Sequence, residues 1–529
     1  MSDPSQKILI VGAGVFGLST ALFLARRGYK DITVIDRISL EINQYHPDAG
    51  CDGASADINK VFRTGYGVRH MYEKLAFRAL PVWQEWNATI RNSSPEELPT
   101  GITPDDDLLV QCGVMRLGEG KELDDYHAQC LQGAIEQGHR DDVYLINDAH
   151  DLARAAQKDK DSPGMHWASK LQRYGVLIGG NIHGMLDMEG GFTRADKSCL
   201  YALHLCKKAG VKFILDQRSG AFDKFIHEGK TILGVVTKDG KEHRADKTIV
   251  AAGGWTASIV PEVSSLLETT AGSLCFIDIP ENRPDLRKKY SPAEFCGWSL
   301  KLKADPGDHE GSYRSMGGFP ADPNGRLKFG FRATKFTNYE TLPNGQKISV
   351  PRTAFTENKI DNIPKKALEA IKSNIMALYP DLAEFGLTGT RMCWYTDSID
   401  CHFLADYVPD TNESLFIASG GSGHGFKFLP IFGENFVNQL EKKEDEFTQY
   451  WKWRSAIPGE SANGLEEGPD GPRTLDKAAM ATRTDWKFDT NRVDDKLDTN
   501  RVVDKLASCR ADWKFDADGV VDKLAKCTV

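Results

Sequence analysis

Three glycines near the N-terminus, Gly12, Gly14 and Gly17, have the spacing of a turn whose backbone must come close to a ligand. An apolar run, Ile8 to Val11, precedes them, and a segment of good helix formers leads into a second apolar run that ends at Asp36. In a strand–turn–helix unit the first glycine makes the tight turn, the second lets the backbone approach a pyrophosphate, and the third lets the helix pack on the strand. The helix N-terminus then binds the pyrophosphate, and the acid reaches a ribose hydroxyl. The pattern predicts a dinucleotide site and leaves open whether the ligand is FAD or NAD.

Two later stretches also end a strand-like run in glycines. The segment ADKTIVAAGGW, residues 245–255, is typical of a buried strand whose end can approach a nucleotide. The segment LFIASGGSGHGFKF, from Leu415, is typical of a strand followed by a glycine loop and a helix. Backbone N–H groups of such a loop can bind an anion or a carbonyl oxygen.

Cationic side chains form a second candidate group. Lys60, Arg63 and Tyr66 are three residues apart, so they share one face if this segment is helical. A solvent-exposed helix face is the ordinary explanation of such a pattern, and the spacing alone does not indicate a function.

Composition limits the class of protein. The chain has 529 residues, 40% hydrophobic and 27% charged, which predicts two or three domains of an ordinary soluble protein. A net charge of −9 argues against nucleic-acid binding, and no apolar run is long enough to cross a membrane. The first strand begins within seven residues of the start and the eleven cysteines lack regular spacing, so we expect a cytoplasmic protein without disulfides.

The other elements are expected from hydrophobic patterns. Trp83 and Trp86 fit the buried side of one helix, and Pro364 to Leu378 is typical of another. Strand-like runs cover 274–279, 298–302 and 327–331. The polar tail, residues 456–529, contains short repeats such as DWKFD at 485–489 and 512–516. We expect this tail to be disordered or loosely helical and dispensable for catalysis, although the repeats could bind a peptide partner.

From residue 7 to about residue 440 the chain resembles the sarcosine oxidase family of FAD-dependent amine oxidases, and especially its fungal fructosyl amino acid, L-pipecolate and L-saccharopine oxidases. The motifs that carry the resemblance are GAGVFG, SADINKVFRTGYG, RLKFGFR, MCWYTDSID and SGGSGHGFKF. The resemblance implies an α/β fold, with a discontinuous Rossmann-type FAD domain and a mixed-sheet α+β substrate domain. The FAD domain would comprise 1–95, 185–260 and 391–450, and the substrate domain 96–184 and 261–390.

The resemblance also implies roles for single residues. Cys393 would carry FAD through a thioether at its 8α carbon, unless it is simply a buried structural cysteine. Lys328 would activate O2 over the flavin, unless it is an exposed strand lysine, and Lys60 would lie beside the flavin. Arg63 and Lys427 would bind the substrate carboxylate. The expected cofactor contacts are Gly12, Gly14, Gly17, Asp36, Arg37, Cys393, Gly423, His424, Gly425, Phe426 and Lys427.

Two departures from the family pattern bear on the substrate. Arg332 stands where the sarcosine enzymes have a histidine, and Gly317 where they have a tyrosine. These changes make sarcosine doubtful and suggest a larger substrate or one with a second anionic group. The terminus, Cys-Thr-Val, lacks the Ser-Lys-Leu type of peroxisomal signal.

The expected reaction is oxidation of the secondary amine of an amino acid to an imine, with reduction of O2 to hydrogen peroxide, by a monomer. L-Pipecolate or saccharopine is the first candidate substrate, and fructosyl amino acids are the second. A third possibility is a biosynthetic oxidation of an N-methyl amino acid to an iminium that is trapped by ring closure, with Asp57 as the base. The alternative of another class is a flavin-binding interaction protein without turnover.

Overall fold

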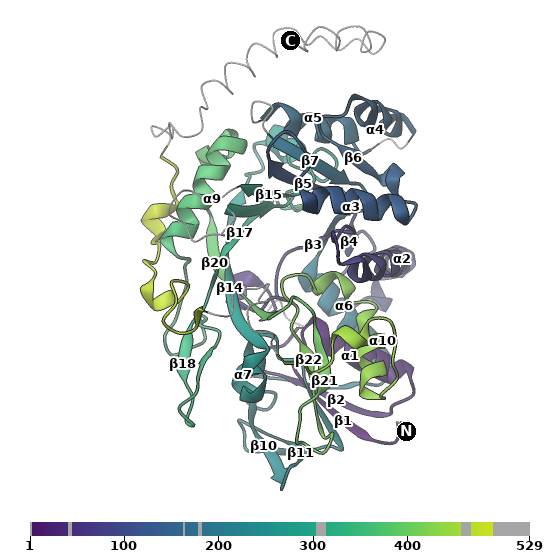
Figure 1. Cartoon of the computed structure of the whole chain (residues 1–529), viewed down its shortest axis with the longest axis vertical. Helices are drawn as coiled ribbons and strands as arrows, with labels where there is room; N and C mark the ends of the chain where they lie inside the picture. The colour runs from purple at the N-terminus through teal and green to yellow at the C-terminus, as the bar shows by residue number, and fades with distance from the viewer. Residues whose placement is uncertain are drawn as a thin grey trace.

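The chain folds around two large sheets, which the computed structural model places in the lower and upper halves of the molecule in Figure 1. The structure describes residues 3–40, 45–161, 164–177, 182–302, 314–455 and 467–489. Within these ranges no helix is both long enough and apolar enough to cross a membrane.

The lower sheet has six strands in the order β21-β22-β13-β1-β2-β9, and all its pairs are parallel except the edge pair β21–β22. Its central strand β1 (Lys7–Val11) is buried from Ile8 onwards, because α1 (Val15–Arg26) covers one face of the sheet and the strands β10 (Phe222–Glu228) and β11 (Thr231–Thr237) cover the other. The other strands are β2 (Asp31–Asp36), β9 (Lys212–Leu215), β13 (Lys247–Val250), β21 (Leu404–Tyr407) and β22 (Leu415–Ser419). The helices of this half are α1 (Val15–Arg26), α2 (His70–Asn92), α6 (Ala195–Lys208), α7 (Thr256–Ile259) and α10 (Phe432–Leu440).

The upper sheet is mixed and has eight strands in the order β20-β14-β17-β16-β15-β5-β7-β6. Its long strands β14, β17 and β20 run down towards the lower sheet (Figure 1), so residues on them reach the junction of the two halves. The strands are β5 (Val114–Glu119), β6 (Val143–Leu145), β7 (Ile182–Asp187), β14 (Leu267–Asp278), β15 (Gly297–Leu302), β16 (Arg314–Gly318), β17 (Arg326–Phe336) and β20 (Gly389–Ser398). Its helices are α3 (Asp125–Glu136), α4 (Ala149–Asp161), α5 (Trp167–Leu177), α8 (Pro284–Lys289) and α9 (Lys365–Leu378).

Three small sheets complete the fold, in the orders β3-β8-β4, β10-β11-β12 and β18-β19. The first of them joins the two halves through β3 (Lys60–Phe62), β8 (Gly191–Thr193) and β4 (Leu109–Val110). The others are formed by β10 (Phe222–Glu228), β11 (Thr231–Thr237), β12 (Glu242–Arg244), β18 (Tyr339–Thr341) and β19 (Lys347–Ser349).

The strand-like runs at 274–279, 298–302 and 327–331 are confirmed as β14, β15 and β17. Trp83 and Trp86 are buried on α2, and the helix expected from Pro364 is α9. The shared helical face of Lys60, Arg63 and Tyr66 is not formed, because Lys60 belongs to strand β3, which pairs with β8.

The tail expectation is wrong for residues 467–489. Leu475 and Ala481 are buried in the hydrophobic core of the upper half, and Thr474 and Met480 form bridges to Thr337 and Pro364. Residues 467–489 therefore belong to the folded upper half. Their few apolar side chains complete a hydrophobic core that strands distant in the sequence build. Residues 456–466 and 490–529, with the second DWKFD repeat, lie outside the described residues.

Candidate active site

The glycine turn between β1 and α1 has the close packing that its spacing requires. Gly12 has a φ of +111°, and a Cβ on Gly17 would lie 1.9 Å from the Gly12 carbonyl oxygen. At the end of β2, Asp36 accepts hydrogen bonds from the backbone N–H groups of Ala13, at 2.7 Å, and Ile38, at 3.0 Å. Burial raises the pKa of Asp36, and these N–H bonds oppose that shift. The acid therefore lies directly against the glycine turn.

A cavity of about 770 Å³ extends from this turn. Asp36, Arg37 and Trp255 line it, and the Arg37 guanidinium carbon lies 4.8 Å from the centre of the Trp255 ring. Lys60 and Tyr395 line it as well. The expected cofactor contacts that line this cavity are Gly12, Gly14, Asp36, Arg37, Gly423, His424, Gly425 and Phe426. Its size and its N–H-rich glycine turn fit a dinucleotide such as FAD.

Asp57 and two lysines form a charged cluster beside the cavity, which one of them, Lys60, lines. The carboxylate oxygen Oδ2 of Asp57 accepts from Lys60 Nζ at 2.5 Å and from Lys328 Nζ at 2.8 Å. Lys328 Nζ also donates to the Asn59 carbonyl at 2.7 Å, and its side chain is only 3% exposed. Lys328 is therefore not an exposed strand lysine, although it lies on β17.

The charges of this cluster depend on one another. Burial opposes ionisation of Asp57, but the ammonium groups of Lys328 and Lys60 hold its pKa below the usual range. Burial lowers the pKa of Lys328 to about 8, against the attraction of Asp57. An anionic carboxylate between two ammonium groups is a poor proton acceptor near neutral pH. The geometry therefore favours Asp57 as the counter-ion that positions two lysines and speaks against its expected role as a base.

Cys393 lies beside this cluster on β20. Its side chain is fully buried, and Lys60 Nζ lies 3.6 Å from its sulfur. Burial disfavours the thiolate, but Lys60 and Arg391 lower the pKa of the Cys393 thiol below its ordinary value. The neighbouring residue Trp394 donates from its backbone N–H to the Asp52 carbonyl, which holds β20 against a segment that lines the cavity. This environment makes the sulfur nucleophilic.

Arg63 and Lys427 meet at Tyr66. Lys427 Nζ donates to the Tyr66 hydroxyl at 2.8 Å, and the Arg63 guanidinium carbon lies 4.0 Å from the centre of the Tyr66 ring. The two residues come from distant elements, a loop after β3 and the glycine loop before α10. A carboxylate clamp made by Arg63 and Lys427 is consistent with this convergence.

Arg116 on β5 and Tyr126 on α3 lie beside Arg63 and were not predicted from the sequence. Tyr126 accepts from Nη1 of Arg63 at 3.1 Å and of Arg116 at 3.3 Å, and both guanidinium groups also donate to the Gly65 carbonyl. Neither residue stands in a recognisable motif. The pairing of β5 with β15 and β7 places Arg116 there, and Tyr126 reaches the same point from α3.

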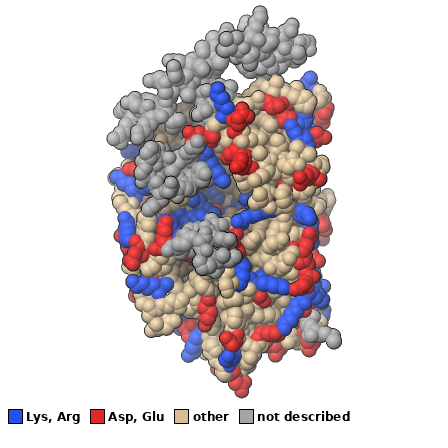
Figure 2. Space-filling view, viewed as in Figure 1, with Lys and Arg blue, Asp and Glu red and all other residues tan. Residues whose placement is uncertain are grey.

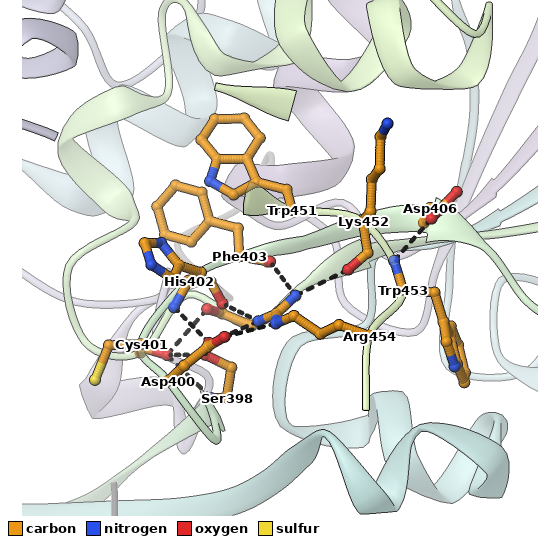
Figure 3. A network of polar contacts seen from close by, with 12 residues as sticks. Ser398, Asp400, Cys401, His402, Phe403, Asp406, Trp451, Lys452, Trp453 and Arg454 are labelled. Atoms are coloured by element: carbon orange, nitrogen blue, oxygen red, sulfur yellow. Dashed lines mark hydrogen bonds and ion pairs between the residues drawn. The ribbon is translucent and has the colours of Figure 1, made fainter. Parts of the chain in front are cut away.

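His424 is held by a second network. The Tyr66 hydroxyl lies 3.2 Å from His424 Nδ1, and His424 Nε2 lies 2.9 Å from the Cys401 carbonyl oxygen. Figure 3 shows how the 398–403 loop is held: Arg454 binds both carboxylate oxygens of Asp400, at 2.6 and 2.7 Å, and also donates to the carbonyls of His402, Phe403 and Lys452. The network orients the carbonyl that receives the histidine N–H.

Arg332 and Gly317, the two departures from the family pattern, both have structural partners. Arg332 Nη2 binds Asp397 Oδ1 at 2.5 Å, so its charge already has a buried counter-ion. A Cβ on Gly317 would lie 2.8 Å from the Trp298 carbonyl oxygen, so pairing of β15 with β16 already requires a small residue there. Arg332 does pack against the glycine loop, because a Cβ on Gly423 would lie 2.4 Å from its Nη1.

Basic side chains dominate the surroundings of this region. Lys and Arg gather around a hollow between the upper and lower halves on the face shown in Figure 2. Five basic residues lie at that junction, on β3, β17, β5 and the adjoining loops: Lys328, Arg116 and Lys427 are buried, and Lys60 and Arg63 are partly buried. Such a field attracts anionic ligands.

Comparison with known proteins agrees with this geometry. A model of the family "FAD dependent oxidoreductase" matches residues 7–439, and the chain belongs to this family. It is 26% identical over 497 residues to the L-saccharopine oxidase of Schizosaccharomyces pombe, covering 89% of this chain and 100% of that protein. It is 25% identical over 478 residues to the amino acid oxidase imqH of Aspergillus flavus, covering 83% of this chain and 94% of that protein. The fructosyl peptide oxidase from E. terrenum has the same fold, with a TM-score of 0.68 at 23% identity over 93% of this chain and 100% of that one.

Proposed function

We propose that this chain is an FAD-dependent amine oxidase that oxidises the secondary amine of an amino acid to an imine and reduces O2 to hydrogen peroxide. The observation that carries the proposal is a dinucleotide cavity flanked by two pairs of basic side chains: Lys60, which lines the cavity, with Lys328, and Arg63 with Lys427, which reach it through Tyr66 and His424. The names of the two relatives, an L-saccharopine oxidase and an amino acid oxidase, support the same reaction class.

FAD would be held by the glycine turn, Asp36, Arg37 and the Gly423–Phe426 loop. When bound, FAD supplies the acceptor for a hydride equivalent from the carbon next to nitrogen. The Cys393 sulfur, activated by Lys60, is the group we assign to covalent attachment at the 8α carbon. Lys328 supplies a positive charge where O2 gains negative charge during its reduction.

Substrate positioning falls to the second pair of basic side chains. Arg63 and Lys427 would bind the α-carboxylate, and this fixes the reacting carbon and supplies proximity. Tyr66 contacts both side chains, and Tyr126 accepts a hydrogen bond from Arg63. We propose L-saccharopine or L-pipecolate as substrate, with fructosyl amino acids second and an N-methyl amino acid whose iminium cyclises third.

A panel assay tests the proposal. The purified holoenzyme is incubated in air with L-saccharopine, L-pipecolate, a fructosyl amino acid and several N-methyl amino acids, and both peroxide and product mass are measured. We expect peroxide with at least one of them, together with a product that has lost two hydrogens or has been hydrolysed or cyclised from that imine. A protein that binds FAD and gives no peroxide with any secondary amino acid would instead be a non-catalytic flavin-binding protein.

We also propose that the chain divides into the two domains that the family resemblance implies. The FAD domain would comprise 1–95, 185–260 and 391–450, and the substrate domain 96–184 and 261–390, extended here by residues 467–489. The core contacts of Leu475 and Ala481 support that extension.

A further inference from the structure

Lys427 is a buried lysine without a carboxylate partner. Its side chain is 1% exposed, and no carboxylate of the described residues forms an ion pair with it. Its hydrogen bond goes to the Tyr66 hydroxyl, at 2.8 Å. An isolated ammonium group in such a place carries a large desolvation cost that no ion pair offsets.

The groups that face Lys427 make a resident charge still less favourable. Arg63 stacks on the Tyr66 ring, and Arg116 donates to the same two acceptors as Arg63, the Gly65 carbonyl and the Tyr126 hydroxyl. Burial lowers the pKa of Lys427 well below that of an ordinary lysine, the two guanidinium groups act in the same direction, and only Asp187 opposes them. The charged and titratable groups facing it are Tyr66 and Arg63 from the loop after β3, Arg116 from β5, Asp187 from β7 and His424 from the glycine loop, while α2 contributes the uncharged Trp83.

An uncharged Lys427 satisfies the hydrogen bonds around Tyr66. His424 Nε2–H donates to the Cys401 carbonyl, which leaves Nδ1 to accept from the Tyr66 hydroxyl. The Tyr66 oxygen can then accept from Lys427, and a neutral amine still has a hydrogen to donate and keeps its lone pair. His424 lines the cavity, so this chain of contacts leads from the cavity to Lys427.

We propose that Lys427 is a neutral amine in the free enzyme and takes the proton of the substrate ammonium group when the substrate carboxylate binds beside it. This inference rests on the proposed function. The step is balanced: one N–H bond of the zwitterion breaks and one forms on Lys427, so a neutral secondary amine and an ammonium group result, and no electron is transferred. The transfer converts the substrate to the form that can lose a hydride equivalent, and it creates the cation that clamps the carboxylate.

Proton linkage tests the charge change without turnover. Cyclohexanecarboxylate has a carboxylate and no ammonium group, so its binding must draw the proton from solution. Calorimetric titration of the holoenzyme near neutral pH in two buffers with different ionisation heats counts the protons. We expect an uptake of about one proton per ligand in the wild type and none in Lys427→Arg, which is permanently charged. Lys158→Arg, at an exposed lysine of α4, is the control and should behave as the wild type. No proton uptake by the wild type would overturn the proposal.

The pH dependence of anaerobic flavin reduction tests the source of the proton. In the wild type the rate at saturating secondary amino acid should be nearly constant from about pH 7 to 9, because Lys427 accepts the proton internally. In Lys427→Arg and Lys427→Met it should rise about tenfold per pH unit, because the substrate must first lose its proton to solution. Equal slopes in wild type and variants would overturn the proposal. Proton uptake without flavin reduction by any secondary amino acid would support the charge change at Lys427 and refute the proposed function.

Discussion

Replacing Lys328 with methionine should separate the two half-reactions of the enzyme. The Lys328 ammonium is fixed by Asp57 at 2.8 Å and the Asn59 carbonyl at 2.7 Å, so its charge is preorganised before O2 arrives. Loss of one preorganised charge costs about 2.7–4 kcal/mol, or about a hundredfold to a thousandfold in the rate of flavin reoxidation. Anaerobic reduction by substrate should change little, because the proposed carboxylate clamp, Arg63 and Lys427, contacts Tyr66 and not this cluster.

The same substitution should also lower the stability of the fold. Asp57 keeps Lys60 at 2.5 Å, but Asp57 and the Asn59 carbonyl each lose a hydrogen bond from Lys328, and a bond to a charged group contributes about 1.5–3 kcal/mol. Flavin content and thermal melting report this cost, and stopped-flow absorbance measures both half-reactions. Lys328→Gln, which removes the charge and keeps N–H donors, should resemble methionine. Lys347→Met, at an exposed lysine of β19, should resemble the wild type.

The pH dependence of reoxidation gives an independent check. A lysine carries its charge below its pKa, and burial lowers the pKa of Lys328 to about 8. Reoxidation should therefore be fast below pH 8 and slow down as the pH rises through that value, and the Lys328→Met profile should be flat. Unchanged reoxidation in Lys328→Met, or a variant that keeps the wild-type pH dependence, would show that Lys328 does not assist O2.

Three further predictions concern the cofactor and the tail. Acid-precipitated wild-type protein should stay yellow and Cys393→Ser should release its flavin; flavin that washes out of the wild type would exclude the thioether. Gly17→Ala should prevent flavin binding, since its Cβ would lie 1.9 Å from the Gly12 oxygen, and full flavin content in the purified variant would contradict the packing argument. Truncation after residue 489 should leave the melting temperature unchanged. Truncation after residue 455 should lower the free energy of unfolding by at least about 1.5–3 kcal/mol, because the core loses Leu475. Equal melting temperatures of the two truncated proteins would show that residues 467–489 are dispensable for stability.

Local patterns were sufficient to predict the nucleotide-binding half of the fold. The turn at Gly12 and Gly17 follows from steric requirements within thirty residues of chain, and α2 was expected from the spacing of Trp83 and Trp86. The conformation of Lys60 could not be predicted locally, because it depends on the pairing of β3 with β8, which lies more than a hundred residues away. The tail was also read from composition alone, which cannot show that Leu475 fills a space left by other elements.

The sequence also predicted only part of the candidate site. The motifs identified Arg63, Lys427, Lys328 and Cys393, but not what each side chain contacts. The counter-ion of Lys328 comes from a loop 271 residues away, and the Lys427 partner Tyr66 is 361 residues away. Only the assembled sheets bring these pairs together. For that reason the charge state of Lys427 could not be inferred from its motif.

Anaerobic mixing of the holoenzyme with a secondary amino acid tests the central claim most directly. With L-saccharopine or L-pipecolate in excess, the absorbance of the oxidised flavin should disappear in a single turnover, and one imine-derived product should form per flavin. Admission of air should restore the absorbance and release an equal amount of hydrogen peroxide. Flavin that stays oxidised with each of these substrates, and with fructosyl and N-methyl amino acids, would contradict the assignment of this chain as an amine oxidase.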